Sequence, residues 1–373
     1  MIGRYSRPFV VRLLLLILIT VFSLTALLLL RAPPTSHEAS TFLYKLNVTL
    51  INNGTQPMPL EGLTLITIFP NSSRQRVLVE RVSYYLNGDE LNGYSFQKSP
   101  EGNTILNLTG APAFLPPRSC LRVYLELSIN LQTTIMNLTT PLIPEESQLL
   151  DDIPAELKEK FCNSTDLWNT QDPELSRLAS SLSGDERVLN VIYNFLTWID
   201  DNIKYPSERE DTEHIVWYPN QTYVEREGDC DDRANLFITL CRCVGIPSYL
   251  QYGAIYEPGS MSFSEYFDSR YRHIMYGMGR HGWAMSYVPP WGWLPIDFTY
   301  FEGLSLVGIN GSLYLKASKP SDHIIGSALF TDSVIVEGNI TVSDYMASNL
   351  KIAELLASYD AYMIEEEALL PHP

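Results

Sequence analysis

The sequence predicts an α+β protein that consists of an N-terminal transmembrane helix, a small all-β domain of sandwich type, and a mixed core of helices and strands. Three observations predict this class. Residues 13–30 form an unbroken apolar run, residues 41–130 contain runs in which apolar and polar side chains alternate, and a helical pattern after residue 230 precedes two more alternating runs. A chain of 373 residues is long enough for two folded units.

The apolar run of residues 13–30 is typical of an uncleaved signal anchor. A helix of this length spans about 27 Å, which is close to the apolar thickness of a bilayer. A cleaved signal peptide is the alternative, although no clear cleavage site follows. Three arginines precede the run and one follows it closely: Arg4, Arg7, Arg12 and Arg31. Because positive charge stays inside, we expect residues 1–12 in the cytoplasm and the rest outside, on a protein that crosses the cell membrane once.

Residues 31–40 contain two adjacent prolines and predict a short linker, and residues 41–140 predict the all-β domain. Its clearest strands are expected at Phe42–Leu50 and Leu121–Ile129, where every second residue is apolar, and Asn-Gly pairs predict turns. We interpret this domain as a spacer that lifts the core away from the membrane. Binding of a partner or of the cell wall is the alternative.

The N-x-S/T sequons predict a glycoprotein if the host glycosylates extracellular proteins. Asn47 carries the most weight, because it alternates with apolar neighbours and is expected on the solvent face of a strand. The sequons begin at Asn47, Asn53, Asn71, Asn107, Asn137, Asn163, Asn220, Asn310 and Asn339.

The remaining segments complete the domain plan. We expect a helical connector at residues 141–184 and the core at residues 185–305. Residues 306–373 are expected to form short strands followed by a final helix from about Asp344 to Leu370. Within the core, an amphipathic helix is expected from Asp185 to Tyr205.

Cys230 stands at the predicted start of a helix in the core. Apolar residues recur three and four positions apart after it: Ala234, Phe237, Ile238, Cys241 and Val244. Gly245 predicts the end of this helix, and Pro247 keeps it from resuming. A cysteine at a helix start lies near unpaired backbone N–H groups, which favour the reactive thiolate. Cys230 is therefore a candidate nucleophile.

His281 and Asp297 are the candidate partners of this thiol. His281 precedes an alternating run that predicts a strand, and Asp297 lies in a second such run after the turn signal of residues 289–292. Two adjacent antiparallel strands would bring the carboxylate beside the imidazole. In such a triad the acid fixes the tautomer of the ring and stabilises the imidazolium.

With these pieces in order, the chain resembles the transglutaminase-like superfamily over roughly residues 185–305. The matching motifs are G-D-C-x-D, V-G-I-P-S, H-x-W and W-x-P-x-D. The resemblance implies a papain-like fold with a Cys-His-Asp triad. In that triad Cys230 is the nucleophile, His281 the base and Asp297 the orienting acid.

The chain departs from the family pattern at two places. Gly282 stands where the family often has Ala or Cys, and we expect this difference to matter little. The stretch from Tyr256 to Arg280 is long for the link between the cysteine helix and the histidine strand. We interpret it as an ordered insertion that serves as a lid or a substrate-selecting loop.

Carboxylates crowd Cys230 in the sequence. Asp229, Asp231 and Asp232 would raise the pKa of a thiol if they were close and unpaired. Asp231 and Asp232 suit the first turn of a helix, so we expect them to cap it, and Arg233 could pair with one of the three. A metal site formed by Cys230, Asp231, Asp232 and His281 is a weak alternative, because the usual ligand spacing is missing. We expect no metal and no cofactor, and no calcium-loop motif is found.

The other cysteines have structural interpretations. Cys120 and Cys162 are possible disulfide partners in an oxidising compartment. Cys241 and Cys243 stand two apart on the predicted helix, so they point to different sides and cannot bond to each other. Cys241 is expected in the core.

The expected function follows from the triad and the charge. The resemblance implies attack on an amide carbonyl through a thioester acyl-enzyme, with the backbone N–H of Cys230 as the first oxyanion donor. A peptidase or amidase acting on a protein or peptide is favoured. A cross-linking transglutaminase and a non-catalytic binding module of the cell envelope are the alternatives. The formal net charge of -17 argues against nucleic acid as a partner, and the sequence carries no signal for the oligomeric state.

Overall fold

The structure is a computed structural model, and every statement below refers to the residues it describes. These are residues 41–72, 74–99, 102–131, 142–184, 186–206, 217–301, 304–305, 319–324, 335–338 and 345–372. The predicted cytoplasmic segment, membrane anchor and linker, residues 1–40, lie outside them. No helix among the described residues has the length and apolar character needed to cross a membrane.

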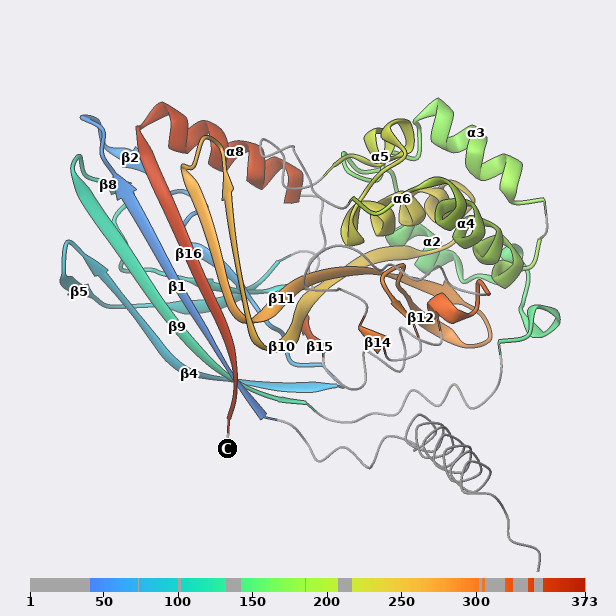
Figure 1. The fold of residues 1–373 in the computed structure, drawn as a ribbon, viewed down its shortest axis with the longest axis horizontal. Coiled ribbons are helices and arrows are strands. Elements are labelled where there is room, and N and C mark those ends of the chain that lie inside the picture. Colours follow the sequence, from blue (N-terminus) through green and yellow to red (C-terminus); the bar gives the residue numbers. More distant parts are fainter. Residues whose placement is uncertain are drawn as a thin grey trace, which may run out of the picture. The chain divides into compact units, whose positions relative to one another are not determined.

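A nine-stranded sheet is the central feature of the fold (Figure 1). Its strand order is β15-β10-β11-β16-β1-β9-β4-β5, and β12 pairs with β11 outside this path. The strands are β1 (Thr41–Asn52), β4 (Gln75–Leu86), β5 (Asp89–Leu91), β9 (Ser119–Leu131), β10 (Ser248–Tyr266), β11 (Tyr271–Val288), β12 (Gly292–Ile296), β15 (Ile335–Gly338) and β16 (Ala361–Pro371). The sheet therefore includes segments from both the predicted β domain and the predicted core.

The strands predicted at Phe42–Leu50 and Leu121–Ile129 are confirmed, because they lie in β1 and β9. These two strands pair antiparallel, and in each of them every second side chain is buried. A smaller sheet packs into the same core through Ile68 and Leu106. The short strands are β2 (Met58–Pro59), β3 (Leu65–Ile68), β6 (Ser95–Lys98), β7 (Thr104–Asn107), β8 (Phe114–Leu115), β13 (Tyr300–Phe301) and β14 (Leu304–Ser305).

The described helices do not all lie together: several pack around the helix that starts at Cys230, while the one nearest the C-terminus packs against β16. They are α2 (Ala155–Phe161), α3 (Pro173–Leu182), α4 (Val188–Asn202), α5 (Pro219–Glu225), α6 (Cys230–Cys243) and α8 (Tyr345–Ser358), together with the short 3-10 helices η1 (Pro144–Glu146) and η2 (Leu150–Asp152). Helix α6 contacts α3, α4, α5, β10 and β11, and every residue from Asp231 to Arg242 is buried. The helix predicted from Asp185 to Tyr205 corresponds to α4.

The cysteines other than Cys230 are free thiols in this arrangement. Cys120 and Cys162 are both free, so the disulfide considered from the sequence is not formed. Cys241 is fully buried in the core around α6, which confirms that prediction.

The prediction of one helix from Asp344 to Leu370 is wrong in its second half. Helix α8 ends at Ser358, Asp360 takes a left-handed backbone conformation (φ 47°), and β16 follows. This strand pairs antiparallel with β1 and parallel with β11. Backbone partners on both sides outweigh the helix propensity of its Glu, Ala and Leu residues.

The stretch from Tyr256 to Arg280 forms the outer part of the β10–β11 hairpin rather than a loop. A bulge lies between Tyr256 and Met261, and beyond it the two strands stay paired up to Tyr266 and Tyr271. Strand β11 also pairs there with β16. The insertion is ordered, as expected, and it extends the central sheet.

Candidate active site

Cys230 is the first residue of α6, at a helix start that carboxylates cap. Asp232 Oδ2 accepts a hydrogen bond from the Asp229 N–H at 3.2 Å, and its Oδ1 accepts one from the Trp217 N–H at 2.9 Å. The prediction that Asp232 caps the helix is confirmed. Because α6 contacts β11 directly, its N-terminus lies beside the strand that carries His281.

His281 and Asp297 form a buried pair. The distance from His281 Nε2 to Asp297 Oδ2 is 2.5 Å, and only 3% of each side chain is exposed. The predicted turn at residues 289–292 joins β11 to β12, and the antiparallel pairing of these strands brings the two residues together. Asp297 Oδ1 also accepts the Thr299 N–H at 2.7 Å, so both carboxylate oxygens are used. The carboxylate fixes the orientation of the ring through Nε2.

The sulfur of Cys230 lies at the same strand. The backbone N–H of Gly282, the residue after His281, donates a hydrogen bond to the thiol of Cys230, and Asp297 is near enough to act on its charge. The structure thus brings the three residues singled out from the sequence to one place.

Gly282 matters more than the sequence suggested. A Cβ atom at this position would lie 2.9 Å from Asp231 Cβ and 3.5 Å from Asp231 Cα. Real Cβ atoms almost never approach this closely, and the obstacle lies close to the backbone of α6. Only glycine therefore lets β11 approach the start of α6 as closely as it does here.

The electrostatic setting of Cys230 favours the neutral thiol. Burial raises its pKa well above the usual value, and the charges of Asp231 and Asp229 raise it further. Asp231 Oδ1 lies 3.6 Å from the sulfur, so this residue acts on the thiol rather than only on the helix end. The Gly282 N–H lowers the pKa but does not reverse the shift. The helix start alone therefore does not produce a resting thiolate.

Arg233 does not pair with the aspartates around Cys230, contrary to the sequence expectation. It forms a buried ion pair with Asp200 at 3.1 Å and donates to the Phe298 carbonyl at 3.4 Å. Its contact with Phe298, the residue after Asp297, supports the strand end that carries the acid.

His323 holds Asp297 in place, a role that the sequence did not reveal. The Asp297 N–H donates to the His323 carbonyl at 3.1 Å, and His323 Nδ1 lies 3.0 Å from the Asp297 carbonyl oxygen. Burial lowers the pKa of His323, which keeps the ring neutral. No local motif marks this histidine, because its role depends on a contact between separate segments.

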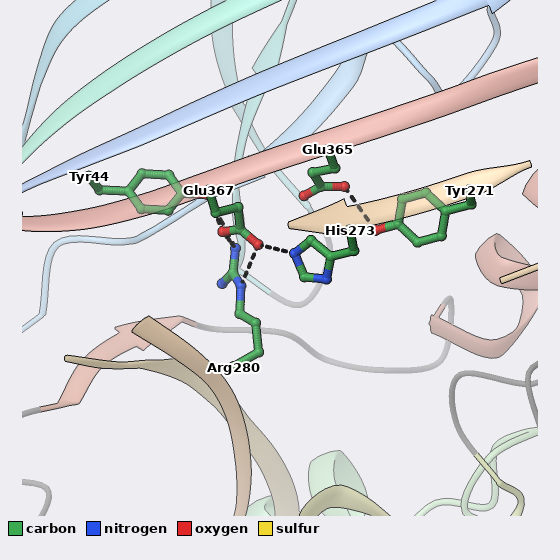
Figure 2. Close-up of polar contacts among 6 residues, drawn as sticks. All are labelled: Tyr44, Tyr271, His273, Arg280, Glu365 and Glu367. Atoms are coloured by element: carbon green, nitrogen blue, oxygen red, sulfur yellow. Dashed lines mark hydrogen bonds and ion pairs between the residues drawn. The ribbon is translucent and has the colours of Figure 1, made fainter. Parts of the chain in front are cut away.

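A cavity of about 430 Å³ opens beside Cys230. Its wall includes Asp229 and Asp231 near the thiol, and a group of polar and charged side chains from β1, β11 and β16. Figure 2 shows this second group, which consists of Tyr44, Tyr271, His273, Arg280, Glu365 and Glu367. Sequence reasoning missed it, since His273 and Glu367 are 94 positions apart in the chain.

The metal site considered from the sequence is not assembled as a unit. Both carboxylate oxygens of Asp232 accept backbone N–H groups, and Nε2 of His281 bonds Asp297. Among the described residues, potential metal ligands do approach one another in two groups: Asp229, Cys230 and Asp231, and separately His273, Glu365 and Glu367.

The model of the transglutaminase-like superfamily matches residues 176–298. Residues 176–298 form a transglutaminase-like domain. The match contains Cys230, His281 and Asp297 and ends just after the acid. Strand β16 lies outside it, so the transglutaminase-like domain supplies only part of the cavity wall.

The fold of the longer chain also recurs in a known structure. A candidate cysteine protease from Cytophaga hutchinsonii superposes with a TM-score of 0.51 and 13% identity, over 90% of this chain and 92% of that chain. Red sea bream transglutaminase superposes with a TM-score of 0.31 and 12% identity, over 85% of this chain and 61% of that chain. The periplasmic domain of TgpA from Pseudomonas aeruginosa superposes with a TM-score of 0.31 and 11% identity, over 70% of this chain and 90% of that chain. None of the curated proteins matches the sequence.

Proposed function

We propose that the protein is a thiol enzyme that hydrolyses amide bonds in proteins or peptides. One observation carries the proposal: His281 bonds Asp297 through Nε2, while Gly282, the next residue, donates its N–H to the thiol of Cys230. This arrangement supports the roles of nucleophile, base and orienting acid, beside a cavity that can admit a substrate.

The proposed reaction begins when the Cys230 sulfur attacks the amide carbonyl carbon and His281 takes the thiol proton. The resulting C–S bond gives a tetrahedral oxyanion, and the Cys230 backbone N–H at the start of α6 is a natural donor to it. The C–N bond then breaks as His281 returns the proton to the leaving amine. Water attacks the thioester, again with His281 as base, and releases a carboxylic acid and the free thiol.

The pKa of Cys230 decides the form of the first step. Because burial and the neighbouring carboxylates raise this pKa, the proton moves to His281 during attack rather than beforehand. Asp297 stabilises the imidazolium that forms. The raised pKa is also the observation that favours the competing proposal, a binding module that keeps the fold without turnover.

A transglutaminase would use the same site with a different second substrate. An amine in place of water would attack the thioester and produce a cross-linked amide. The carboxylates that line the cavity would attract such an amine, so transfer is kept as the second proposed activity.

We also propose that residues 13–30 anchor the enzyme in the cell membrane with the rest of the chain outside the cytoplasm. The arginines before the apolar run support this orientation. Protease added to intact cells should degrade the enzyme domain, whereas protection until the membrane is opened would contradict the proposal.

Incubation of the full-length protein with a peptide library tests the activity. Mass spectrometry separates the outcomes, because hydrolysis adds one water across a cleaved bond and transfer joins two peptides. Cys230→Ala should abolish every product, while Cys243→Ala, at a half-buried cysteine of the same helix, should preserve them. Products that persist in Cys230→Ala would overturn the proposal.

A further inference from the structure

The cavity beside Cys230 has a wall that the transglutaminase-like domain does not supply on its own. Strands β11 and β16 run parallel, with Tyr271 opposite Met363 and His273 opposite Glu365. Alternate residues of a strand face the same side. One side of this strand pair lines the cavity, through Tyr271, His273, Met275, Met363, Glu365 and Glu367.

Glu367 is already neutralised by its neighbours. It accepts a hydrogen bond from Arg280 Nε at 3.0 Å and a second, shorter one from Arg280 Nη2. His273 Nε2 lies 2.7 Å away and the Tyr44 hydroxyl 2.6 Å away (Figure 2). Only 1% of the Glu367 side chain is exposed. This carboxylate and Arg280 form a closed pair, so neither is left to bind a charged ligand.

Glu365 differs from Glu367 in its partners. It accepts a hydrogen bond from the Tyr271 hydroxyl at 3.1 Å (Figure 2). Among the described residues, no Lys or Arg forms an ion pair with it. Burial and the nearby Glu367 raise the pKa of Glu365, although His273, Arg280 and the Tyr271 hydroxyl act in the opposite direction, so its negative charge is only partly compensated. A cation in the cavity would therefore be stabilised by Glu365.

Two further carboxylates increase the negative charge of the cavity. Asp229 and Asp231 line it at the end where Cys230 lies. Against these acidic groups the wall offers Arg280, which is engaged by Glu367, and His273. The field inside the cavity consequently favours a positive group and disfavours a negative one.

Aromatic rings form another part of the same wall. Tyr266 and Phe267 stack with Tyr271 at centroid distances of 5.8 and 6.4 Å. All three residues line the cavity. The ring faces attract ammonium groups, which gives a second means of recognition that is independent of the carboxylates.

We propose that this cavity binds an ammonium group of the substrate, close to the amide bond that Cys230 attacks, with Glu365 as its counter-ion. The inference rests on the proposed function. The volume of about 430 Å³ lies at the small end of the range for ligand sites, roughly 300–1,000 Å³, and suits one amine-bearing side chain. A divalent metal ion fits less well, because it would have to displace Arg280 from Glu367.

Charged thiol reagents of similar size test the inference in the full-length protein. Aminoethyl methanethiosulfonate carries an ammonium group and sulfonatoethyl methanethiosulfonate carries a sulfonate. Each forms a mixed disulfide with the thiol and releases methanesulfinate. The two rates are measured at Cys230 by peptide mass spectrometry, and each is divided by the rate of the neutral methyl reagent, which removes differences in thiol reactivity.

We expect the cationic reagent to react faster than the anionic one, and Glu365→Gln to reduce their rate ratio by about tenfold. Glu366→Gln is the matched control, because it makes the same charge change one residue along β16, where the side chain bonds Asn47 instead. Its ratio should stay within about twofold of the wild type.

The outcomes separate the two proposals. Two results overturn the ammonium subsite alone. In the first, Cys230 reacts with the neutral reagent but shows no preference between the cationic and anionic reagents. In the second, the ratio of the cationic to the anionic rate is the same in Glu365→Gln as in wild type. A Cys230 that is inert to the neutral reagent at all pH values contradicts the proposed function. Peptide products from the library provide a second measurement, because cleaved bonds should lie next to residues that carry an amine.

Discussion

Arg280 donates to Glu367 through Nε at 3.0 Å, and this ion pair connects the strand that carries His281 to the C-terminal strand β16. Arg280 directly precedes His281 in β11. The aromatic rings of Tyr44 and Tyr252 also contact the guanidinium, at 5.9 and 5.6 Å from their centroids. The segment next to the candidate base is therefore held by residues outside the transglutaminase-like domain as well as within it.

Replacement of Glu367 should strongly destabilise the protein. Glu367→Gln leaves Arg280, whose side chain is 21% exposed, without its counter-ion, and loss of one partner of a buried pair costs about 3–5 kcal/mol. The free energy of unfolding, measured by urea denaturation, should fall by this amount. Glu126→Gln is the control, because its pair with Lys45 is partly exposed and contributes less than about 1 kcal/mol. Equal losses in the two variants would disprove the importance of the buried pair.

The stabilising effect of Glu367 should depend on pH. Burial alone would raise its pKa, but Arg280 and His273 lower it from the ordinary value of 4.5 to about 2. A group whose pKa is lowered in the folded state stabilises it above the unfolded pKa and loses this effect as the pH falls through the folded pKa. The stability difference between wild type and Glu367→Gln should therefore shrink between about pH 4.5 and 2. Because Glu367 also raises the pKa of His273, the difference should decrease as well when the pH rises through the pKa of that histidine. Thermal unfolding at several pH values measures it, and a difference that grows between pH 4.5 and 2 would refute the assignment.

Gly282→Ala should damage the site more than its size suggests. The added methyl group would lie 2.9 Å from Asp231 Cβ, so β11 and the start of α6 must separate. We expect a loss of about 1–3 kcal/mol of stability and labelling of Cys230 at least about tenfold slower. Gly184→Ala serves as the control, because a Cβ there meets nothing within 4 Å. A fully active Gly282→Ala protein would mean that the close approach is unnecessary.

Asp231→Asn should make the thiol of Cys230 more acidic. Burial is the largest cause of its raised pKa, and the charge of Asp231 is the next. Removal of that charge favours the thiolate, so the pH profile of iodoacetamide labelling should move to lower pH. Asp89→Asn, at an exposed position in β5, should leave the profile unchanged. A shift to higher pH in Asp231→Asn would show that the carboxylate instead assists deprotonation.

The placement of Cys230, His281 and Asp297 near one another could be predicted from the sequence because each residue sits in a contiguous pattern. A capped helix start marks Cys230, and a strand-turn-strand pattern marks His281 and Asp297. The wall formed by Glu365 and Glu367 could not be predicted in this way. Their segment contains good helix formers and becomes a strand because β1 and β11 supply backbone partners on both sides. Such long-range pairing leaves no local signal.

The most direct test of the account is the rate of iodoacetamide labelling at Cys230 in the full-length protein at pH 7, compared with His281→Ala and Asp297→Asn. If the three residues act as one unit, both variants should slow the labelling by at least about tenfold, because the imidazole no longer accepts the thiol proton in the correct tautomer. His372→Ala, at an exposed position near the C-terminus, should label like the wild type. Equal rates in all four proteins would contradict the triad and favour a binding module.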